Sequence, residues 1–221
     1  GLGVDEGTPD ETTICRFRAA VSQGGVMDAC FAEINRQLDA KGLMLKKGTL
    51  LDASIVAATH NPPHREAGMG SRHPKEPGAD WTNKGGKSYF GYKMHVGVDE
   101  GSGLIRTALF TPARLLDGQA AEALICGDEA AVYADRAYES KRRRAALKAA
   151  GIKDRIMHRR HKYMPTLPHW MAVRNDLIAR RRAPVEAIFS AMKRLYGKAR
   201  TRCHSLERNA ADFIAFATVY N

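Results

Sequence analysis

The chain has 221 residues, 44% of them apolar, which is enough to bury a core in one domain of ordinary size with a small appendage. Its four cysteines form no paired short spacing, which excludes a disulfide framework and a zinc ribbon. No apolar run reaches the roughly eighteen residues of a membrane span, and the first residues lack the basic and apolar parts of a signal peptide. A soluble protein of a reducing cytosol is expected.

The formal net charge of +11 is concentrated in one part of the chain. Residues 136–208 hold 21 Lys and Arg against 5 Asp and Glu, whereas the remaining residues hold 14 against 19. This bias fits either a solvated surface or a surface that binds phosphate groups, and we favour phosphate binding. Nucleic acid is the partner that it indicates.

The N-terminal residues predict two helices. The first follows a cap at Thr8 or Asp10 and ends at Gly24–Gly25, and the second covers an amphipathic stretch that stops at Gly42. We therefore expect a helical segment over residues 1–40 and one larger domain over residues 41–221.

Strand signals come next in the chain. Residues 48–59 are a short apolar run with β-branched side chains and one carboxylate, Asp52, which favours a central strand. Residues 60–87 are rich in Pro, Gly, His and Lys and show no period, so we expect a loop or insertion there. Residues 89–99 and 103–113 alternate around a Gly-rich turn, which predicts two antiparallel strands.

The rest of the chain alternates between helices and strands. The pattern predicts helices over 118–127, 139–151, 170–196 and 210–220, strands over 130–135 and 152–157, and a basic connector over 158–169. Pro184 interrupts the long helix and disfavours helical backbone at Ala183, so we expect a break or kink there. The whole order predicts an α/β fold in which helices flank a mixed sheet.

Three carboxylates lie where a fold alone does not require them. Asp52 is inside an apolar strand, Asp135 ends another strand, and Glu186 is in a helix rich in arginine. Each has a structural alternative, because Asp52 could be a satisfied core residue, Asp135 a helix cap, and Glu186 a partner of Arg182. Mg²⁺ binds a few carboxylates together with water and substrate phosphate, so two strand-end Asp residues and a Glu from a crossing helix would suit such ions.

The order strand Asp, strand Asp, helix Glu resembles that of the DDE transposases, which have a ribonuclease-H-like fold. Arg182, Glu186 and Lys193 match the spacing of the signature Tyr-x2-Arg-x3-Glu-x6-Lys of bacterial insertion-sequence transposases, whereas Ala179 stands at the position of the tyrosine. Similar blocks over residues 9–18, 47–58, 89–104 and 132–140 extend the resemblance, which looks like the insertion-sequence-five type.

The resemblance implies hydrolysis at transposon ends and attack of the freed 3′-hydroxyl on target DNA. It makes Asp52, Asp135 and Glu186 the catalytic and metal-binding residues, with two Mg²⁺ or Mn²⁺ ions as the cofactor. The residues that it places on DNA are Arg136, Arg182, Lys193 and Arg194. A homodimer or higher oligomer on DNA is expected, because two transposon ends must be handled together, and the nucleoid is the expected location in the cell.

Two alternatives stay open at this point. One is a nuclease of the same fold without strand transfer, and the other is a truncated or inactive transposase remnant that only binds DNA. A zinc site in the histidine-rich connector is not supported, because His158 and His161 are separated by two residues but have no second Cys or His pair at ligand spacing. His169 and His204 do not supply such a pair.

Overall fold

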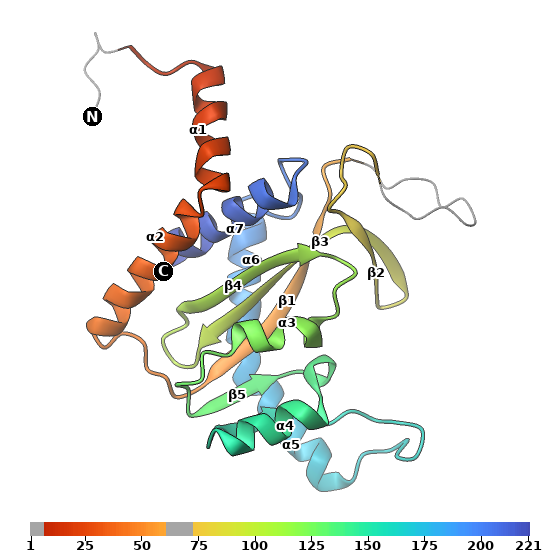
Figure 1. The fold of residues 1–221 in the computed structure, drawn as a ribbon. Coiled ribbons are helices and arrows are strands. Elements are labelled where there is room, and N and C mark those ends of the chain that lie inside the picture. The colour runs from red at the N-terminus through yellow and green to blue at the C-terminus, as the bar shows by residue number, and fades with distance from the viewer. Residues whose placement is uncertain (1–6, 61–72) are drawn as a thin grey trace.

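The computed structural model describes residues 7–60 and 73–221, which form a six-stranded mixed sheet flanked by helices (Figure 1). The strands are β1 (Thr49–Ala57), β2 (Asp80–Lys84), β3 (Lys87–Asp99), β4 (Ile105–Pro112), β5 (Ala131–Ala134) and β6 (Lys153–Ile156). The helices are α1 (Glu11–Gln23), α2 (Val26–Ala40), α3 (Asp117–Leu124), α4 (Lys141–Ala149), α5 (His169–Arg182), α6 (Pro184–Arg194) and α7 (Leu206–Tyr220), with a 3-10 turn η1 (Arg136–Tyr138).

Strand β1 lies in the middle of the sheet. It pairs with β3 in antiparallel and with β5 in parallel orientation, and β5 pairs with β6 in parallel. Strands β2 and β4 both pair with β3 in antiparallel orientation. The sheet order is consistent with the predicted ribonuclease-H-like fold, and the mixed α/β architecture is confirmed.

The two faces of the sheet bury separate apolar clusters. Side chains alternate between the faces along a strand, so Leu50 and Leu51 of β1 enter different clusters. The Leu50 cluster includes side chains of α6 and α7, and the Leu51 cluster includes side chains of α3 and α4. In Figure 1, α6 accordingly passes behind the sheet and α3 and α4 lie in front of it.

The expected N-terminal helical segment is present. Asp10 caps α1, its carboxylate accepting a hydrogen bond from the backbone N–H of Thr13 at 2.6 Å. Helix α1 extends away from the sheet and buries no residue, whereas α2 contributes Phe31 to the core and contacts α7 (Figure 1). None of the helices in residues 7–60 and 73–221 has both the length and the apolar character needed to cross a bilayer.

The prediction of a loop over residues 60–87 is wrong for the C-terminal part of this range. Residues Asp80–Lys84 form β2, which pairs with the first residues of β3. The two strands are joined by Gly85 and Gly86, whose φ angles of 58° and 78° suit the two-residue hairpin turn that glycine pairs favour. Residues 61–72 of the predicted insertion lie outside the described residues.

The expected interruption near Ala183 is confirmed, but the expected backbone of Ala183 is wrong. Helices α5 and α6 are separate elements that meet at this residue, and Pro184 occupies the first position of α6. Ala183 nevertheless keeps helical angles, φ −48° and ψ −37°. Proline at a first helical position loses no hydrogen bond within its own helix, so the chain changes helix here without leaving helical backbone.

Candidate active site

The pairing of β1 with β5 brings two of the three carboxylates side by side. These strands run parallel, with Leu50 opposite Tyr133. Asp52 and Asp135 each follow two residues later, so both project from the same face of the sheet at neighbouring positions. This is the face covered by α6.

The third carboxylate comes from the helix that covers this face. Glu186 lies in the first turn of α6 and is exposed, while Val185, Ile188, Phe189 and Met192 bury the helix against the sheet. Asp52, Asp135 and Glu186 line one cleft of about 240 Å³, together with Ala179, Arg182 and Ala183. A larger cavity of about 430 Å³, between α1 and α7, is mainly apolar and contains none of these residues.

Arg182 reaches the cleft from α5, a different helix from the one that carries Glu186. Its guanidinium lies 3.2 Å from the Asp52 carboxylate and donates to the Leu51 carbonyl at 3.4 Å. Both side chains are largely shielded, with 13% of Arg182 and 26% of Asp52 exposed. Arg182 therefore fixes the Asp52 carboxylate, and it is the only predicted DNA-binding residue that lines the cleft.

Burial is the main influence on the ionisation of Asp52. It raises the pKa of this carboxyl above its usual value of 3.8, and the negative charge of Asp135 acts in the same direction. Arg182, the backbone N–H of Ala53 and Lys84 oppose the rise in pKa but do not cancel it. A cation in the cleft would therefore relieve an unfavourable charge.

The donor set suits hard divalent cations. Asp135 accepts a hydrogen bond from the Ala137 backbone N–H at 2.8 Å, and neither Asp135 nor Glu186 has a Lys, Arg or His ion-pair partner within the described part of the chain. The three carboxylates do not all lie within 4.8 Å of one another. This spread is compatible with ligands arranged around two ions about 4 Å apart, which do not all touch one ion.

The other predicted DNA-binding residues lie outside the cleft lining. Lys193 is half-buried on α6, seven residues after Glu186, and therefore on the same side of the helix. Burial lowers the pKa of Lys193, and the nearby charge of Lys84 lowers it further. Arg136 and Arg194 are exposed.

Two residues near the cleft were missed in the sequence. Lys84, at the end of β2, lies close enough for its charge to affect both Asp52 and Lys193. Tyr138 is buried, and its hydroxyl has no hydrogen-bond partner among the described residues. Burial raises the pKa of Tyr138, as do the charges of Asp117, Asp52 and Asp135. The Gly85–Gly86 turn could have located Lys84, whereas no sequence signal distinguishes Tyr138.

A comparison with known families identifies the family of this chain. A family model described as a transposase DDE domain matches residues 44–221, which include every strand of the sheet and all three carboxylates of the cleft. The match thus covers most of the chain, and the chain belongs to the family of transposase DDE domain proteins.

Proposed function

We propose that this protein is a DNA transposase of the insertion-sequence-five type, which hydrolyses phosphodiester bonds at transposon ends and joins the freed 3′-hydroxyl to target DNA. One observation carries the proposal: Asp52, Asp135 and Glu186, from three distant parts of the chain, line one cleft in a member of this family. Support for the insertion-sequence-five type comes from the Arg182, Glu186 and Lys193 spacing combined with the similar blocks over residues 9–18, 47–58, 89–104 and 132–140.

Asp52, Asp135 and Glu186 are proposed to hold two Mg²⁺ or Mn²⁺ ions. Bound there, the cations would make a water or 3′-hydroxyl a better nucleophile and neutralise charge at the reacting phosphorus. Arg182 keeps Asp52 oriented toward the cleft, and the Ala137 N–H does the same for Asp135. Glu186 is exposed and can turn toward the substrate side.

The phosphates flanking the reacting bond need positive charge from the protein. We assign this role to Arg136, Arg182, Lys193 and Arg194. Lys84 supplements them, because its charge reaches the same carboxylate that Arg182 contacts. DNA is the partner that the family implies, and we propose that the protein acts on it at the nucleoid.

We further propose that residues 41–221 form the catalytic domain and residues 1–40 a helical segment in front of it. Transposition needs two ends cut in one complex, so a dimer or higher oligomer is proposed on DNA. Helix α1 offers a surface for such contacts, since Ile14 and Phe17 are 49% and 67% exposed.

The test uses a supercoiled plasmid that carries both ends of the parent element. With Mg²⁺ or Mn²⁺ the protein should cut at the ends and yield joined products, and EDTA should abolish both activities. Asp52→Asn and Glu186→Gln should each lower cleavage on the order of 1,000-fold or more. Glu207→Gln, an exposed glutamate of α7, serves as the matched control and should cleave normally.

The products separate this proposal from its alternatives. Cleavage without joined ends would indicate a nuclease of the same fold. A salt-dependent gel shift without cleavage, at saturating metal, would indicate a remnant that only binds DNA. Full activity of Asp52→Asn would reject the assigned site.

A further inference from the structure

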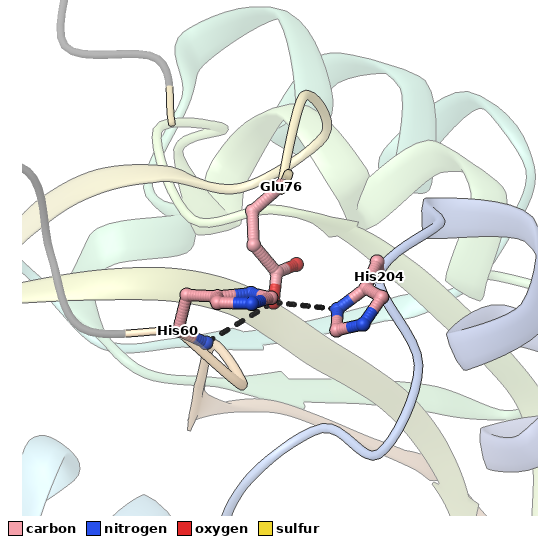
Figure 2. Close-up of side chains that lie close together, drawn as sticks. All are labelled: His60, Glu76 and His204. Carbon is pink, nitrogen blue, oxygen red and sulfur yellow. Dashed lines mark hydrogen bonds and ion pairs between the residues drawn. The ribbon is translucent and has the colours of Figure 1, made fainter. Parts of the chain in front are cut away.

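A second group of potential metal ligands lies outside the acidic cleft. His60 follows β1, Glu76 precedes β2, and His204 precedes α7, and their side chains converge as Figure 2 shows. One ligand atom from each lies within 4.8 Å of the other two. His204 thus meets two residues, His60 and Glu76, that come from a much earlier part of the chain.

The two distances from the imidazoles to Glu76 match those between neighbouring ligands of a metal ion. Nδ1 of His60 lies 3.2 Å from Oε1 of Glu76, and Nδ1 of His204 lies 3.6 Å from the same oxygen. Ligands about 2.0–2.1 Å from a tetrahedral ion are separated by about 3.4 Å. Only a small movement is needed to place one ion between the three atoms.

The buried negative charge of Glu76 also favours a bound cation. Its side chain is fully buried, and its ion-pair partners within the described residues are the two imidazoles, whose positive charge depends on protonation. The other group at ligand spacing, Cys126, Asp128 and Glu129, differs because Arg106 contacts both of its carboxylates. A divalent ion would supply a permanent positive charge to Glu76 and has no such role at the other group.

Surrounding groups hold the Glu76 carboxylate in place. The buried Tyr92 hydroxyl donates to Oε2 at 2.9 Å, and the Thr59 backbone N–H donates to Oε1 at 3.0 Å. Outer hydrogen bonds of this kind orient the ligands of protein metal sites. His204 is 57% exposed, so an ion can reach the group from solvent.

We propose that His60, Glu76 and His204 bind one Zn²⁺ ion, with water as the fourth ligand, in a site separate from the acidic cleft. Two imidazoles and a carboxylate favour a borderline ion such as Zn²⁺ over Mg²⁺, which prefers oxygen ligands.

The role of the proposed Zn²⁺ site is structural, because the ion would cross-link segments of the chain. It joins the end of β1, the strand that carries Asp52, to the connection between α6 and α7. Hydrogen bonds already join these segments, since the Thr201 N–H donates to the Ala57 carbonyl at 2.9 Å and the Thr59 hydroxyl donates to the Thr201 carbonyl at 2.9 Å. Bound metal adds a link across long stretches of chain, where loop closure costs most entropy.

The test measures metal binding by the metal-free full chain, without DNA. Zn²⁺ titrated against a chromophoric chelator should bind tightly at one equivalent, and Co²⁺ should give the intense visible absorption of a tetrahedral site. His60→Ala and His204→Ala should lose this absorption and weaken Zn²⁺ binding by more than the ~10–100-fold that loss of an outer partner costs. Tyr92→Phe removes such an outer partner and should weaken binding within that range. Zn²⁺ should raise the Tm of the wild-type chain but not that of His204→Ala.

Matched controls separate this site from other ligands. His161→Ala removes an exposed histidine elsewhere, and Asp52→Asn alters the acidic cleft, so both should bind Zn²⁺ and Co²⁺ like the wild type. If His60→Ala fails to fold, His204→Ala is the deciding variant, because the His204 side chain is 57% exposed and its removal should leave the circular dichroism spectrum unchanged. The proposal would be overturned if the wild-type chain did not bind one equivalent of Zn²⁺ tightly, or if His204→Ala bound Zn²⁺ as tightly as the wild type. Neither outcome bears on DNA cleavage.

Discussion

Asp52 combines a largely buried carboxylate with an arginine partner, and these features act on its charge in opposite directions. Burial prevails, so the pKa of Asp52 is raised. A carboxyl group that is costly to ionise in the metal-free protein is stabilised most, in its ionised form, by a bound cation. At the residue scale, the ionised Asp52 carboxylate is therefore an unfavourable charge that a bound metal ion would compensate.

This charge gives a prediction for stability. Folded Asp52 keeps its proton to a higher pH than the unfolded chain does, so the folded state binds more protons over that interval and loses stability as pH rises through it. In EDTA, Asp52→Asn should avoid this loss and be at least as stable as the wild type at neutral pH. Thermal unfolding between pH 3.5 and 7, roughly spanning the usual Asp pKa and neutrality, measures it. A clearly lower Tm of Asp52→Asn at neutral pH would mean that pairing with Arg182 dominates.

The structural alternatives for the three carboxylates are partly true. Asp135 does cap the turn η1, and Asp52 does have an arginine partner, but that partner is the same Arg182 that was considered for Glu186. Single-residue patterns identified these side chains, since a carboxylate in an apolar strand is unusual. Which arginine pairs with which carboxylate depends on how α5 meets β1, and no local pattern encodes that.

At the scale of elements, the hairpin of β2 and β3 is the main departure from expectation. The β2 sequence, Asp80–Lys84, contains four polar or charged residues, and all five positions are partly exposed or exposed, so its apolar alternation is weak. Pairing with the long strand β3 stabilises it instead. The turn at Gly85–Gly86 was the usable signal, and it places Lys84 and Lys87 at the hairpin tip.

The hairpin tip should contact DNA. Changing Lys84 and Lys87 to Ala should weaken DNA binding and reduce the slope of log affinity against log salt concentration by up to about 2, because two phosphate contacts are lost. Fluorescence anisotropy over a salt series measures this slope. Lys148→Ala with Lys153→Ala removes the same charge from α4 and β6, and an equal effect of that pair would show that only net charge matters.

The junction of α5 and α6 offers a second test. Pro184→Ala restores a backbone N–H and favours one continuous helix, so stability should be unchanged or higher by up to ~1 kcal/mol. Cleavage should fall roughly tenfold or more, because Arg182 and Glu186 would shift relative to each other. Denaturant unfolding and plasmid cleavage measure the two effects. Pro165→Ala, outside the two helices, is the control and should cleave normally. Normal cleavage by Pro184→Ala would contradict a positioning role for the break between α5 and α6.

At the scale of the whole molecule, the charge bias of residues 136–208 overstates the DNA surface. Arg143 is buried and hydrogen bonds to the Tyr138 carbonyl and to Glu122, and Arg144 pairs with Asp154. These arginines stabilise the α4 side of the fold. Composition can count basic residues, but it cannot tell those that face solvent from those that satisfy internal carbonyls and carboxylates.

The sequence predicted most helices and strands because their apolar periods are local. It also singled out the three carboxylates that line one cleft, from an apolar strand, a strand end and the resemblance of residues 182–193, while their metal-binding role stays a prediction. The meeting of His60, Glu76 and His204 was beyond it, since these residues belong to three segments with no common spacing. Groups of this kind arise only when the sheet and the connection before α7 are assembled.

The central claim is that Asp52, Asp135 and Glu186 together hold the catalytic cations. A crystal soaked in Mn²⁺, with anomalous diffraction recorded above the manganese edge, tests it most directly. We predict manganese peaks within roughly 2.0–2.3 Å of oxygens from all three carboxylates, and their loss in Asp52→Asn. Manganese bound elsewhere, with this cleft empty at concentrations that support DNA cleavage, would contradict the account.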